Sequence, residues 1–516
     1  MMAARQNSTQ HHLLSVLLEG IAPVTPKNDV EISGVTLDSR KVKGGELFIA
    51  TGGTLQHGAL FIEQAVRSGA AAVVAEPSGA VTLPEGPMVI DGRTVPLIVV
   101  DGLRQRVGLI AERFYGEPTS KMFVAGVTGT NGKTSVSHFI AQVLNGRGPC
   151  GLVGTLGSGL YGELGDIAGR TTPDAVTLHE NIAQMYAAGA RQVAMEVSSH
   201  GLDQGRVAGV AFDVAVFTNL THEHLDYHGD MESYAVAKRR LFDMPGIHTA
   251  VVNADDAVGR RWLDELTGRV ERISYGLEGG EAMRSGLQAT LYGHALRLHG
   301  HGLSMTVTSP WGEAQLDTGL IGRFNASNLL AALGALIAAG LSFEAAIGGL
   351  SQVNTVPGRM ERFGGEGGDP LVVVDYAHTP DALEQVLKAA ADHCDGHLWC
   401  VFGCGGNRDS AKRPLMGRVA EMYADCIIIT DDNPRDEDPY SIIEAILSGM
   451  TDPDRPYVIR DREAAISRAI ALCHNGDVVV VAGKGHETEQ EIAGKKYPFS
   501  DREVVTRIVN AGGGHG

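Results

Sequence analysis

A glycine-rich segment between an apolar strand and a helix is the feature that most constrains the fold of this chain. The residues FVAGVT at 123–128 are typical of a buried strand, GTNGKT follows, and a helical pattern begins near Lys133. A strand that passes through a tight glycine turn into a helix is typical of an α/β sheet with helices packed on its faces. The sequence therefore predicts an α/β fold around this segment.

The same segment has the composition of a phosphate-binding loop. In GVTGTNGKT, residues 126–134, backbone N–H groups can surround phosphate oxygens, while Lys133 supplies a positive charge and Thr134 a hydroxyl ligand for Mg²⁺. Val127 stands where the strict G-x-x-x-x-G-K-[ST] pattern has its first glycine, with a glycine on either side nearby. A tight glycine turn without a ligand is the alternative, but the strand before it and the helix after it favour ATP or GTP. The predicted nucleotide-binding residues are Thr128, Gly129, Thr130, Asn131, Gly132, Lys133 and Thr134.

The length of 516 residues indicates several domains, because one hydrophobic core rarely serves so long a chain. The linker-like GEPTS follows a first α/β segment, and GGEGGDP precedes the strands LVVVDYA, HLWCVFG, CIIITDD and DVVVVAG, which alternate with predicted helices. That alternation predicts a doubly wound parallel sheet. We expect three α/β domains at 1–118, 119–355 and 356–516, the second resembling a P-loop ATPase and the third a Rossmann fold.

Charge and hydropathy exclude two classes of partner. The formal net charge of −18 argues against a nucleic-acid partner, because neutralising phosphates requires clustered Lys and Arg. The longest apolar stretch, Leu329–Leu341, is too short to span a bilayer, and the first residues lack the pattern of a signal peptide. We therefore expect a cytoplasmic protein without membrane insertion.

Six cysteines in a chain of this length do not suggest a disulfide framework. Cys394, Cys400 and Cys404 lie near two histidines, so a zinc site is one interpretation. The alternation in LWCVFGC instead favours a buried strand in which the cysteines act as small hydrophobic residues.

A carboxylate and a histidine at predicted strand ends are candidate metal ligands. Glu196 ends the strand RQVAMEV, and the strand FDVAVFTNL leads into THEHLDYHG. Because strand ends on an α/β sheet face the ligand crevice, Glu196 and His224 are expected to reach the metal of the phosphate loop together with Thr134. Three histidines in HEHLDYH also fit zinc, but a hard cation with oxygen ligands suits a phosphate loop better.

Four polar clusters follow strands of the C-terminal segment, at Asp375–His378, Gly405–Arg408, Asp432–Arg435 and Gly483–Glu487. A doubly wound sheet gathers such positions into one crevice. The tetrapeptide DNPR at 432–435 is also compatible with a plain surface turn. The clusters together predict a binding site in this domain.

Several motifs in a fixed order carry a family resemblance. GTNGKT, EVSSHGL, HLDYHGDMESYAVAK, GRFNASN and DYAHTPDAL together resemble the Mur ligases, the ATP-dependent enzymes of cytoplasmic peptidoglycan synthesis. The resemblance runs almost end to end. LDSR at 37–40 is similar to the UDP-substrate motif of the diaminopimelate-adding members.

The resemblance implies an acyl-phosphate reaction with ATP and Mg²⁺ as cofactors. ATP would phosphorylate the D-glutamate γ-carboxylate of UDP-N-acetylmuramoyl-L-alanyl-D-glutamate, and the amine of meso-2,6-diaminopimelate would attack the product. In that family the lysine matching Lys238 is carbamylated, which turns a cation into an anionic ligand for Mg²⁺. From residue type alone, Lys238 on its predicted helix would be solvated. The implied catalytic residues are Lys133, Lys238 and His224, and the implied metal ligands are Thr134, Glu196, His224 and carbamylated Lys238.

The resemblance also implies the residues that contact each substrate. Asn325 would lie near adenine, and Arg359, Asp375 and His378 would approach the nucleotide from the C-terminal domain. The uridylated substrate would contact Leu37, Ser39, Thr54, Leu55, Gln56, Thr171, Thr172, Ser198, Gln204 and Arg206. The diaminopimelate would contact Arg408, Asp432, Asn433, Pro434, Arg435, Gly483 and Glu487.

Within this last set, the resemblance gives the DNPR arginine the role of selecting the amino acid. Arg435 would bind the distal carboxylate, which a lysine substrate lacks, since a planar guanidinium can form two parallel charge-assisted hydrogen bonds. Arg408 would add a second cationic contact, and Glu487 would pair with the ammonium group.

Two other functions share the phosphate loop. A folylpolyglutamate synthetase-like ligase would use the same chemistry, but LDSR and DNPR argue against it. A nucleotide-gated binding module could hydrolyse ATP slowly, although it would need neither a metal-binding lysine nor a carboxylate-selective crevice. The expected protein is a monomeric ligase whose partners are its small-molecule substrates.

Overall fold

The computed structural model describes residues 11–53, 56–79, 81–84, 86–165, 171–286, 288–365 and 370–512. The chain divides into two compact units, residues 1–274 with 338–340 and residues 275–337 with 341–516. This division is coarser than the three predicted domains, whose boundaries stay predictions. None of the helices in the described residues combines the length and apolar character needed to cross a membrane.

A small parallel sheet organises the start of the first unit. Its strands take the order β3-β4-β5-β8, and each neighbouring pair is parallel. Apolar side chains of the strands alternate between two hydrophobic clusters, so both faces of the sheet are covered. The elements are β3 (Gly34–Thr36), β4 (Glu46–Ala50), α2 (Ile62–Arg67), β5 (Ala72–Ala75), β8 (Leu97–Val99) and α3 (Val107–Phe114).

A second sheet of the first unit carries the phosphate-loop segment. The part of this eleven-stranded sheet that lies in the first unit has the strand order β12-β11-β10-β13-β9-β14-β15, and β10, β13, β9, β14 and β15 run parallel. Its strands are β9 (Phe123–Thr128), β10 (Cys150–Gly154), β11 (Gly157–Leu160), β12 (Glu163–Gly165), β13 (Gln192–Glu196), β14 (Val214–Phe217) and β15 (Thr249–Asn253). Its helices are α4 (Lys133–Asn145), α5 (Ala175–Ala187), α6 (Ser199–Asp203), α7 (Leu225–His228), α8 (Met231–Arg239) and α9 (Ala257–Glu265). Since β9 has neighbours on both sides, the loop that follows it lies at the middle of the sheet edge.

The second unit begins with antiparallel strands and a buried helix. β17 pairs with β18, and β18 with β19, in antiparallel register. Helix α11 is apolar on nearly all sides, which is typical of a helix enclosed by its neighbours. The elements are β16 (Glu271–Leu277), which spans the unit boundary, α10 (Glu281–Arg284), β17 (Leu291–His299), β18 (Gly302–Ser309), β19 (Gly312–Thr318), α11 (Arg323–Ala338) and α12 (Phe343–Leu350).

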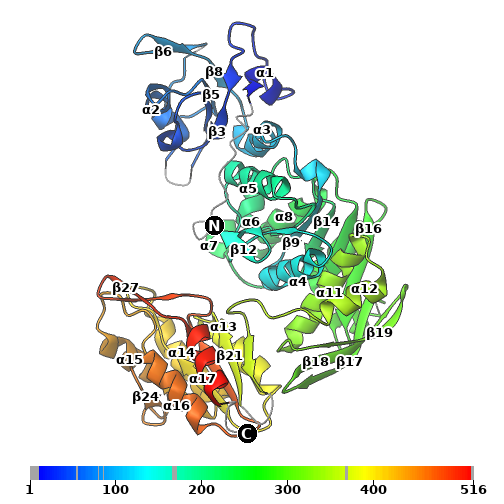
Figure 1. Cartoon of the computed structure of the whole chain (residues 1–516), viewed down its shortest axis with the longest axis vertical. Coiled ribbons are helices and arrows are strands. Elements are labelled where there is room, and N and C mark those ends of the chain that lie inside the picture. The colour runs from blue at the N-terminus through cyan, green and yellow to red at the C-terminus, as the bar shows by residue number, and fades with distance from the viewer. Residues whose placement is uncertain are drawn as a thin grey trace. The chain divides into compact units, whose positions relative to one another are not determined.

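The C-terminal sheet is doubly wound, as the sequence predicts (Figure 1, yellow to red). Its strands take the order β20-β21-β25-β22-β23-β24, and only the edge strand β20 is antiparallel to its neighbour. The strands are β20 (Glu361–Gly364), β21 (Leu371–Asp375), β22 (Leu398–Phe402), β23 (Cys426–Ile429), β24 (Tyr457–Val458) and β25 (Val478–Ala482). The helices are α13 (Pro380–Ala391), α14 (Lys412–Tyr423), α15 (Pro439–Leu447), α16 (Arg462–Leu472) and α17 (Asp501–Gly512). The chain reverses its winding at β25, and such a reversal opens a crevice at the carboxyl ends of the strands.

Alternation along the strands explains why helices cover both faces of this sheet. Val373 and Val480 pack with residues of α13, α14 and α15, whereas Val372 and Val479 pack with α16 and α17. Cys400 and Cys404 belong to the first of these clusters, together with their apolar neighbours. Cys394, Cys400 and Cys404 are free thiols, and the last two are part of the hydrophobic core, as the alternation in LWCVFGC predicts.

Candidate functional site

The predicted phosphate loop lies between β9 and α4, and its turn depends on two glycines. Gly129 and Gly132 have φ angles of 150° and 85°, conformations that favour glycine. The N–H of Thr130 donates to the backbone oxygen of Asn219 at 2.8 Å, and the N–H of Asn131 donates to its side-chain oxygen at 2.9 Å. Asn219, which follows β14, therefore fixes the position of the turn.

The lysine of the loop lies over the loop's own backbone. Lys133 Nζ donates to the backbone oxygens of Gly129 at 2.9 Å and Thr130 at 2.8 Å. Lys133 is also the first residue of α4, and Gly132 before it has no side chain that could cap the helix. The first N–H groups of a helix have no partner within the helix and carry partial positive charge. Lysine and helix start therefore create a positive site at the end of β9, where Thr128 is fully buried.

The carboxylate at the end of β13 meets the hydroxyl of the loop's last threonine. Glu196 is 1% exposed, and its Oε2 accepts a hydrogen bond from Thr134 Oγ1 at 3.0 Å. Thr155 donates to the same carboxylate through its N–H at 2.7 Å and through its hydroxyl at 3.2 Å. A hydroxyl and a carboxylate are hard oxygen ligands of the kind that Mg²⁺ prefers, so Thr134 and Glu196 fit the predicted metal. The described residues hold no group of three His, Cys, Asp or Glu side chains placed for a metal.

The lysine of α8 is buried against the phosphate loop. Lys238 is 1% exposed, and its Nζ donates to the backbone oxygen of Gly129 at 2.7 Å. The Nζ also lies 4.5 Å from the centre of the Tyr234 ring. Burial, and to a smaller extent the nearby charge of Lys133, lower the pKa of Lys238 well below its ordinary value. Lys238 is thus a buried amine beside the phosphate loop rather than a solvated cation.

His224, the predicted metal-binding histidine, contacts Tyr234, and Tyr234 in turn contacts the phosphate loop. His224 directly precedes α7 with a φ angle of 58°, and its ring centre is 6.1 Å from that of Tyr234. The Tyr234 hydroxyl lies 3.3 Å from Thr130 Oγ1, and burial raises its pKa to about 12. Tyr234 therefore contacts the loop, lies edge-on to His224 and faces the amine of Lys238.

Five residues predicted to contact the uridylated substrate lie together near Glu196, the predicted metal ligand. Thr172 Oγ1 donates to the backbone oxygen of Glu196 at 3.1 Å and accepts the N–H of Ser198 at 3.1 Å. Arg206 donates to the backbone oxygen of Thr172 at 2.8 Å and to Gln204 Oε1 at 2.7 Å. The fifth residue is the neighbouring Thr171. Its hydroxyl oxygen lies 3.1 Å from the hydroxyl oxygen of Thr155, and Thr155 also donates to the Glu196 carboxylate. The structure thus brings these residues together beside Glu196, and their contacts with the substrate stay predictions.

The remaining residues of that set lie in the N-terminal sheet region. Ser39 is buried, and its hydroxyl donates to Gln64 Oε1 at 2.9 Å. Leu37 packs at the edge of a hydrophobic cluster, and Gln56 is exposed. Thr54 and Leu55 lie outside the described residues. The substrate contacts of this group stay predictions.

The residues predicted to reach the nucleotide from the second unit have well-defined partners there. Asn325 is buried in α11, and its side-chain amide donates to the backbone oxygen of Ile321 at 2.8 Å. Asp375 accepts two backbone N–H groups at 2.7 Å, and burial raises its pKa. Arg359 lies over the Tyr376 ring at 5.6 Å, and His378 Nδ1 is 2.8 Å from the backbone oxygen of the same tyrosine. Their roles toward ATP stay predictions.

The polar clusters of the C-terminal domain meet at the carboxyl ends of its strands. A Cβ atom added to Gly483 would lie 2.5 Å from Asp432 Oδ2, so only glycine fits there. A Cβ atom added to Gly405 would lie 3.0 Å from Arg435 Nη1 and 3.7 Å from Arg408 Cγ. The two arginines therefore lie beside the same glycine, as expected for one crevice. Pro434 is buried between its neighbours.

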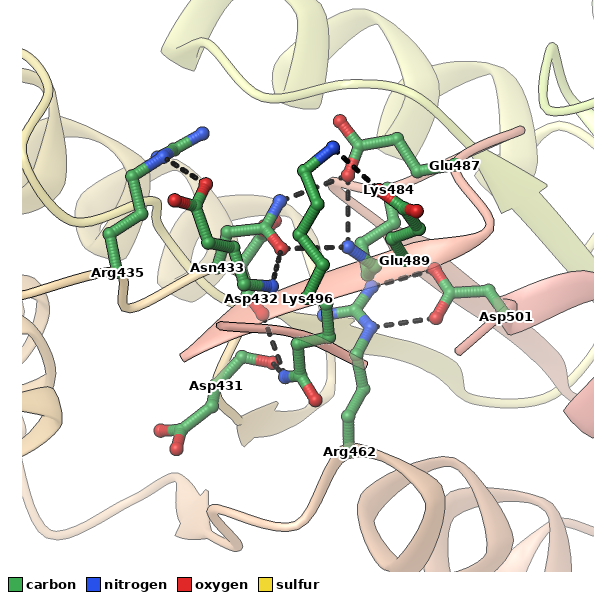
Figure 2. Close-up of polar contacts among 12 residues, drawn as sticks. Asp431, Asp432, Asn433, Arg435, Arg462, Lys484, Glu487, Glu489, Lys496 and Asp501 are labelled. Atoms are coloured by element: carbon green, nitrogen blue, oxygen red, sulfur yellow. Dashed lines mark hydrogen bonds and ion pairs between the residues drawn. The ribbon is translucent and has the colours of Figure 1, made fainter. Parts of the chain in front are cut away.

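A buried lysine joins two of the predicted diaminopimelate contacts. Lys484 is fully buried, and its Nζ donates to Asn433 Oδ1 at 3.1 Å and to Glu487 Oε2 at 2.9 Å (Figure 2). Asn433 also donates to Glu487 Oε2 at 2.9 Å. Burial by itself would raise the pKa of Glu487, but the hydrogen bonds from Lys484 and Asn433 hold it below its ordinary value. Glu487 is therefore a fixed negative charge near the carboxyl ends of these strands.

A second buried pair contacts the end of β25, directly before Gly483. Arg462 and Asp501 are both fully buried, and the guanidinium donates two hydrogen bonds to the carboxylate, at 2.7 and 2.8 Å (Figure 2). Arg462 also donates to the backbone oxygen of Ala482 at 2.9 Å, at the end of β25. The pair therefore anchors the strand end from which Gly483 starts.

Several supporting residues of the site were not identified from the sequence. Thr155, Tyr234 and Asn219 contact the phosphate loop or the Glu196 carboxylate. Tyr234 lies within the motif HLDYHGDMESYAVAK, but no role was predicted for it, and no motif marks Thr155 or Asn219. Lys484 could have been found, because it follows a buried strand within the recognised Gly483–Glu487 cluster.

Models of one family match most of the chain, and they place it in a single class. The Mur ligase middle domain matches residues 127–336, the Mur ligase glutamate ligase domain matches residues 358–485, and the catalytic domain of the Mur ligase family matches residues 31–115. The chain belongs to the Mur ligase family.

Individual relatives narrow the class further. A protein of Ectopseudomonas mendocina named UDP-N-acetylmuramoyl-L-alanyl-D-glutamate--2,6-diaminopimelate ligase is 50% identical, over 92% of this chain and 94% of its own. A protein of Pseudomonas aeruginosa with the same name is 48% identical, over 94% of this chain and 96% of its own length. A solved structure of a ligase of that name is 35% identical, with a TM-score of 0.74, and the match covers 98% of this chain and 99% of that chain.

Proposed function

We propose that this chain is the ATP-dependent ligase that joins meso-2,6-diaminopimelate to the D-glutamate γ-carboxylate of UDP-N-acetylmuramoyl-L-alanyl-D-glutamate in the cytoplasm. Similarity over more than nine tenths of the chain to ligases of that name supports the reaction. The folylpolyglutamate synthetase-like alternative is not favoured. The relatives that match this chain over nearly their full length are named as diaminopimelate ligases.

The charged residues of the proposed C-terminal binding site support meso-diaminopimelate as the amino-acid substrate. Arg435 and Arg408 lie beside Gly405, and Glu487 is held as a carboxylate by Lys484 and Asn433. Diaminopimelate presents a carboxylate at both ends and an amine beside each, so it matches two arginines and one carboxylate. Lysine has no distal carboxylate for an arginine to bind. We therefore assign this crevice to diaminopimelate.

The first step follows from the phosphate loop. A γ-carboxylate oxygen of the UDP-linked dipeptide attacks the terminal phosphorus of ATP, an acyl phosphate forms and ADP leaves. Lys133 and the N–H groups at the start of α4 stabilise the negative charge on the transferring phosphoryl group. Mg²⁺ held by Thr134, Glu196, His224 and Lys238 would neutralise phosphate charge when bound.

The second step needs only positioned substrates. The amine attacks the acyl carbon, the C–O bond to phosphate breaks, and the amine loses a proton as the amide forms. Glu487, held by Lys484 and Asn433, binds the ammonium group that does not react and so orients the other amine. No side-chain nucleophile takes part.

We propose that Lys238 acts as a carbamate. Its neutral Nζ forms a bond to the carbon of CO₂ and releases one proton, which leaves an anionic carbamate that keeps one N–H. That N–H can still donate to the backbone oxygen of Gly129, which lies 2.7 Å from Nζ. The new negative charge also lies close to the cation Lys133, whose charge lowers the pKa of the unmodified amine. The reaction thus converts a neutral amine, whose protonated form is destabilised by burial and by Lys133, into an anion that the Lys133 charge stabilises.

Dependence of ADP release on substrates tests the proposed function. We expect purified protein with ATP and Mg²⁺ to release ADP rapidly only when the UDP-linked dipeptide and meso-diaminopimelate are both present. Lys133→Ala serves as the matched control, and it should abolish this release. Release that does not depend on the amino acid would instead support a nucleotide-gated binding module.

A further inference from the structure

The hairpin formed by β26 (Glu489–Ile492) and β27 (Lys495–Pro498) packs directly against the DNPR segment. Its two strands pair with each other in antiparallel register, and one isolated β-bridge joins Ile492 of β26 to Arg435. A two-stranded hairpin without further support has marginal stability. The contacts that hold it are therefore informative. They concentrate on residues 431–435.

Backbone and side-chain hydrogen bonds run from the hairpin to successive DNPR residues. Gln490 Nε2 donates to the backbone oxygen of Asp432 at 2.7 Å, and the N–H of Glu491 donates to Asn433 Oδ1 at 2.9 Å. The N–H of Arg435 donates to the backbone oxygen of Glu491 at 3.0 Å. Glu491 thus bonds the DNPR segment through both of its backbone groups.

The contact also fixes an unusual backbone conformation. Arg435 has a φ angle of 51°, and Ala493 in the hairpin turn has a φ angle of 49°. Both angles lie in the left-handed region, which costs free energy for residues other than glycine. The two residues bond each other, since the Ala493 N–H donates to the backbone oxygen of Arg435 at 2.6 Å. Such a conformation persists only where the surroundings hold it, and it aims the arginine side chain.

The guanidinium of Arg435 is held through two of its three nitrogen atoms. Nε donates to Glu491 Oε2 at 3.1 Å, and Nη1 donates to the backbone oxygen of Gly406 at 2.8 Å. Nη2 forms no hydrogen bond within the part of the chain that the structure describes. A carboxylate can form two parallel hydrogen bonds with the Nε–Nη2 edge or with the Nη1–Nη2 edge of a guanidinium. Because Nε donates to Glu491, the Nη1–Nη2 edge remains, and Nη1 has a second hydrogen beside the one that it donates to Gly406. Figure 2 shows Arg435 extending beyond Asn433, away from the Arg462–Asp501 pair.

From these contacts we propose that Glu491 is a positioning residue that sets the amino-acid specificity of the site. It holds Arg435 through Nε, so that the remaining edge of the guanidinium is already oriented for the distal carboxylate of a diamino diacid. The proposal rests on the proposed function and deepens it. Without Glu491, the ligand itself would have to immobilise a long, flexible side chain.

Glu491→Gln tests the proposal, with Glu489→Gln as the matched control. Both residues lie on β26 and project to the same face, but Glu489 pairs with the exposed Lys496 at 2.7 Å on the surface. We expect Glu491→Gln to raise the KM for meso-diaminopimelate roughly three- to tenfold, the effect of immobilising one long side chain on binding. The KM for ATP should stay unchanged, and Glu489→Gln should match the wild type.

A double variant separates positioning from a general structural effect. In a chain that already carries Arg435→Ala, adding Glu491→Gln should cause no further rise in the KM for diaminopimelate, because the two residues act as a unit. A KM within about twofold of the wild type for Glu491→Gln, additive effects in the double variant, or a parallel rise in the KM for ATP would each overturn the proposal. Failure of the proposed function is distinguishable, because the wild-type chain would then form no product with diaminopimelate.

Discussion

The Lys484→Met substitution probes whether a buried cation keeps Glu487 ready for an ammonium group. Methionine has nearly the same length and suits a fully buried position, but it cannot donate a hydrogen bond. The substitution removes the bonds from Nζ to Asn433 and Glu487. Asn433 keeps its bond from the N–H of Glu491, so the surrounding backbone should stay in place.

The expected size of the effect follows from the bond to Glu487. A hydrogen bond to a charged group contributes about 1.5 to 3 kcal/mol. The Glu487 side chain is 32% exposed, so water can replace part of the interaction, and we take the lower end of the range. A loss of about 1.4 kcal/mol corresponds to about tenfold in affinity. The KM for diaminopimelate should therefore rise about tenfold.

The pH dependence of the variant should shift in a defined direction. In the wild type the folded-state pKa of Glu487 lies below its ordinary value of 4.5, so the contribution of its charge to stability is present above that pH and is lost as the pH falls through the folded-state pKa. Without the hydrogen bond and the charge of Lys484, the effect of burial is less well compensated, and the pKa of Glu487 should rise. Binding of the ammonium group should then weaken at a higher pH in the variant than in the wild type.

Steady-state ligation between pH 5 and 8, with diaminopimelate varied, would measure both effects. Lys496→Met is the matched control, because Lys496 pairs with Glu489 at 2.7 Å on the surface and such pairs contribute little. A KM for Lys484→Met that stays within about twofold of the wild type at every pH would refute the reasoning. A change of the same size in the control would refute it as well.

Three further predictions concern other parts of the site. Lys238→Ala should reduce ligation to near the background rate, and added short carboxylates should restore part of it; full activity would exclude the carbamate. Arg435→Ala should raise the KM for diaminopimelate far more than that for ATP, and equal kinetics would contradict the assignment of the crevice. Arg462→Met should lower the free energy of unfolding in urea by about 3 to 5 kcal/mol, because the Asp501 carboxylate stays buried without its cation; a loss below about 1 kcal/mol would contradict this account.

Much of the fold could be predicted from local patterns. The apolar runs at β21 and β25 are short and unbroken, as expected for strands covered on both faces. The order of strand, glycine turn and helix gave the position of the phosphate loop, because only glycine adopts the left-handed angles of Gly132 without strain. Polar residues that follow successive strands predicted a binding site in the C-terminal domain, because a doubly wound sheet gathers such positions at one edge.

The remaining features depend on contacts between distant parts of the chain. Lys238 has the sequence context of an exposed helical lysine, and its burial arises only because α8 packs beside the phosphate loop. Lys484 finds its partner Asn433 far away in the sequence. The hairpin around Glu491 is polar and short, and the left-handed conformation of Arg435 has no glycine to mark it. Such features are set by tertiary packing and leave no local pattern.

Product analysis from a mixture of amino acids tests the central claim most directly. Purified protein would receive ATP, Mg²⁺, the UDP-linked dipeptide and equal concentrations of meso-diaminopimelate and L-lysine, and mass spectrometry would identify the products. We predict that the UDP-linked tripeptide containing diaminopimelate forms almost alone, with one ADP released for each amide bond. Comparable amounts of the lysine product, or ADP release without any tripeptide, would contradict the account.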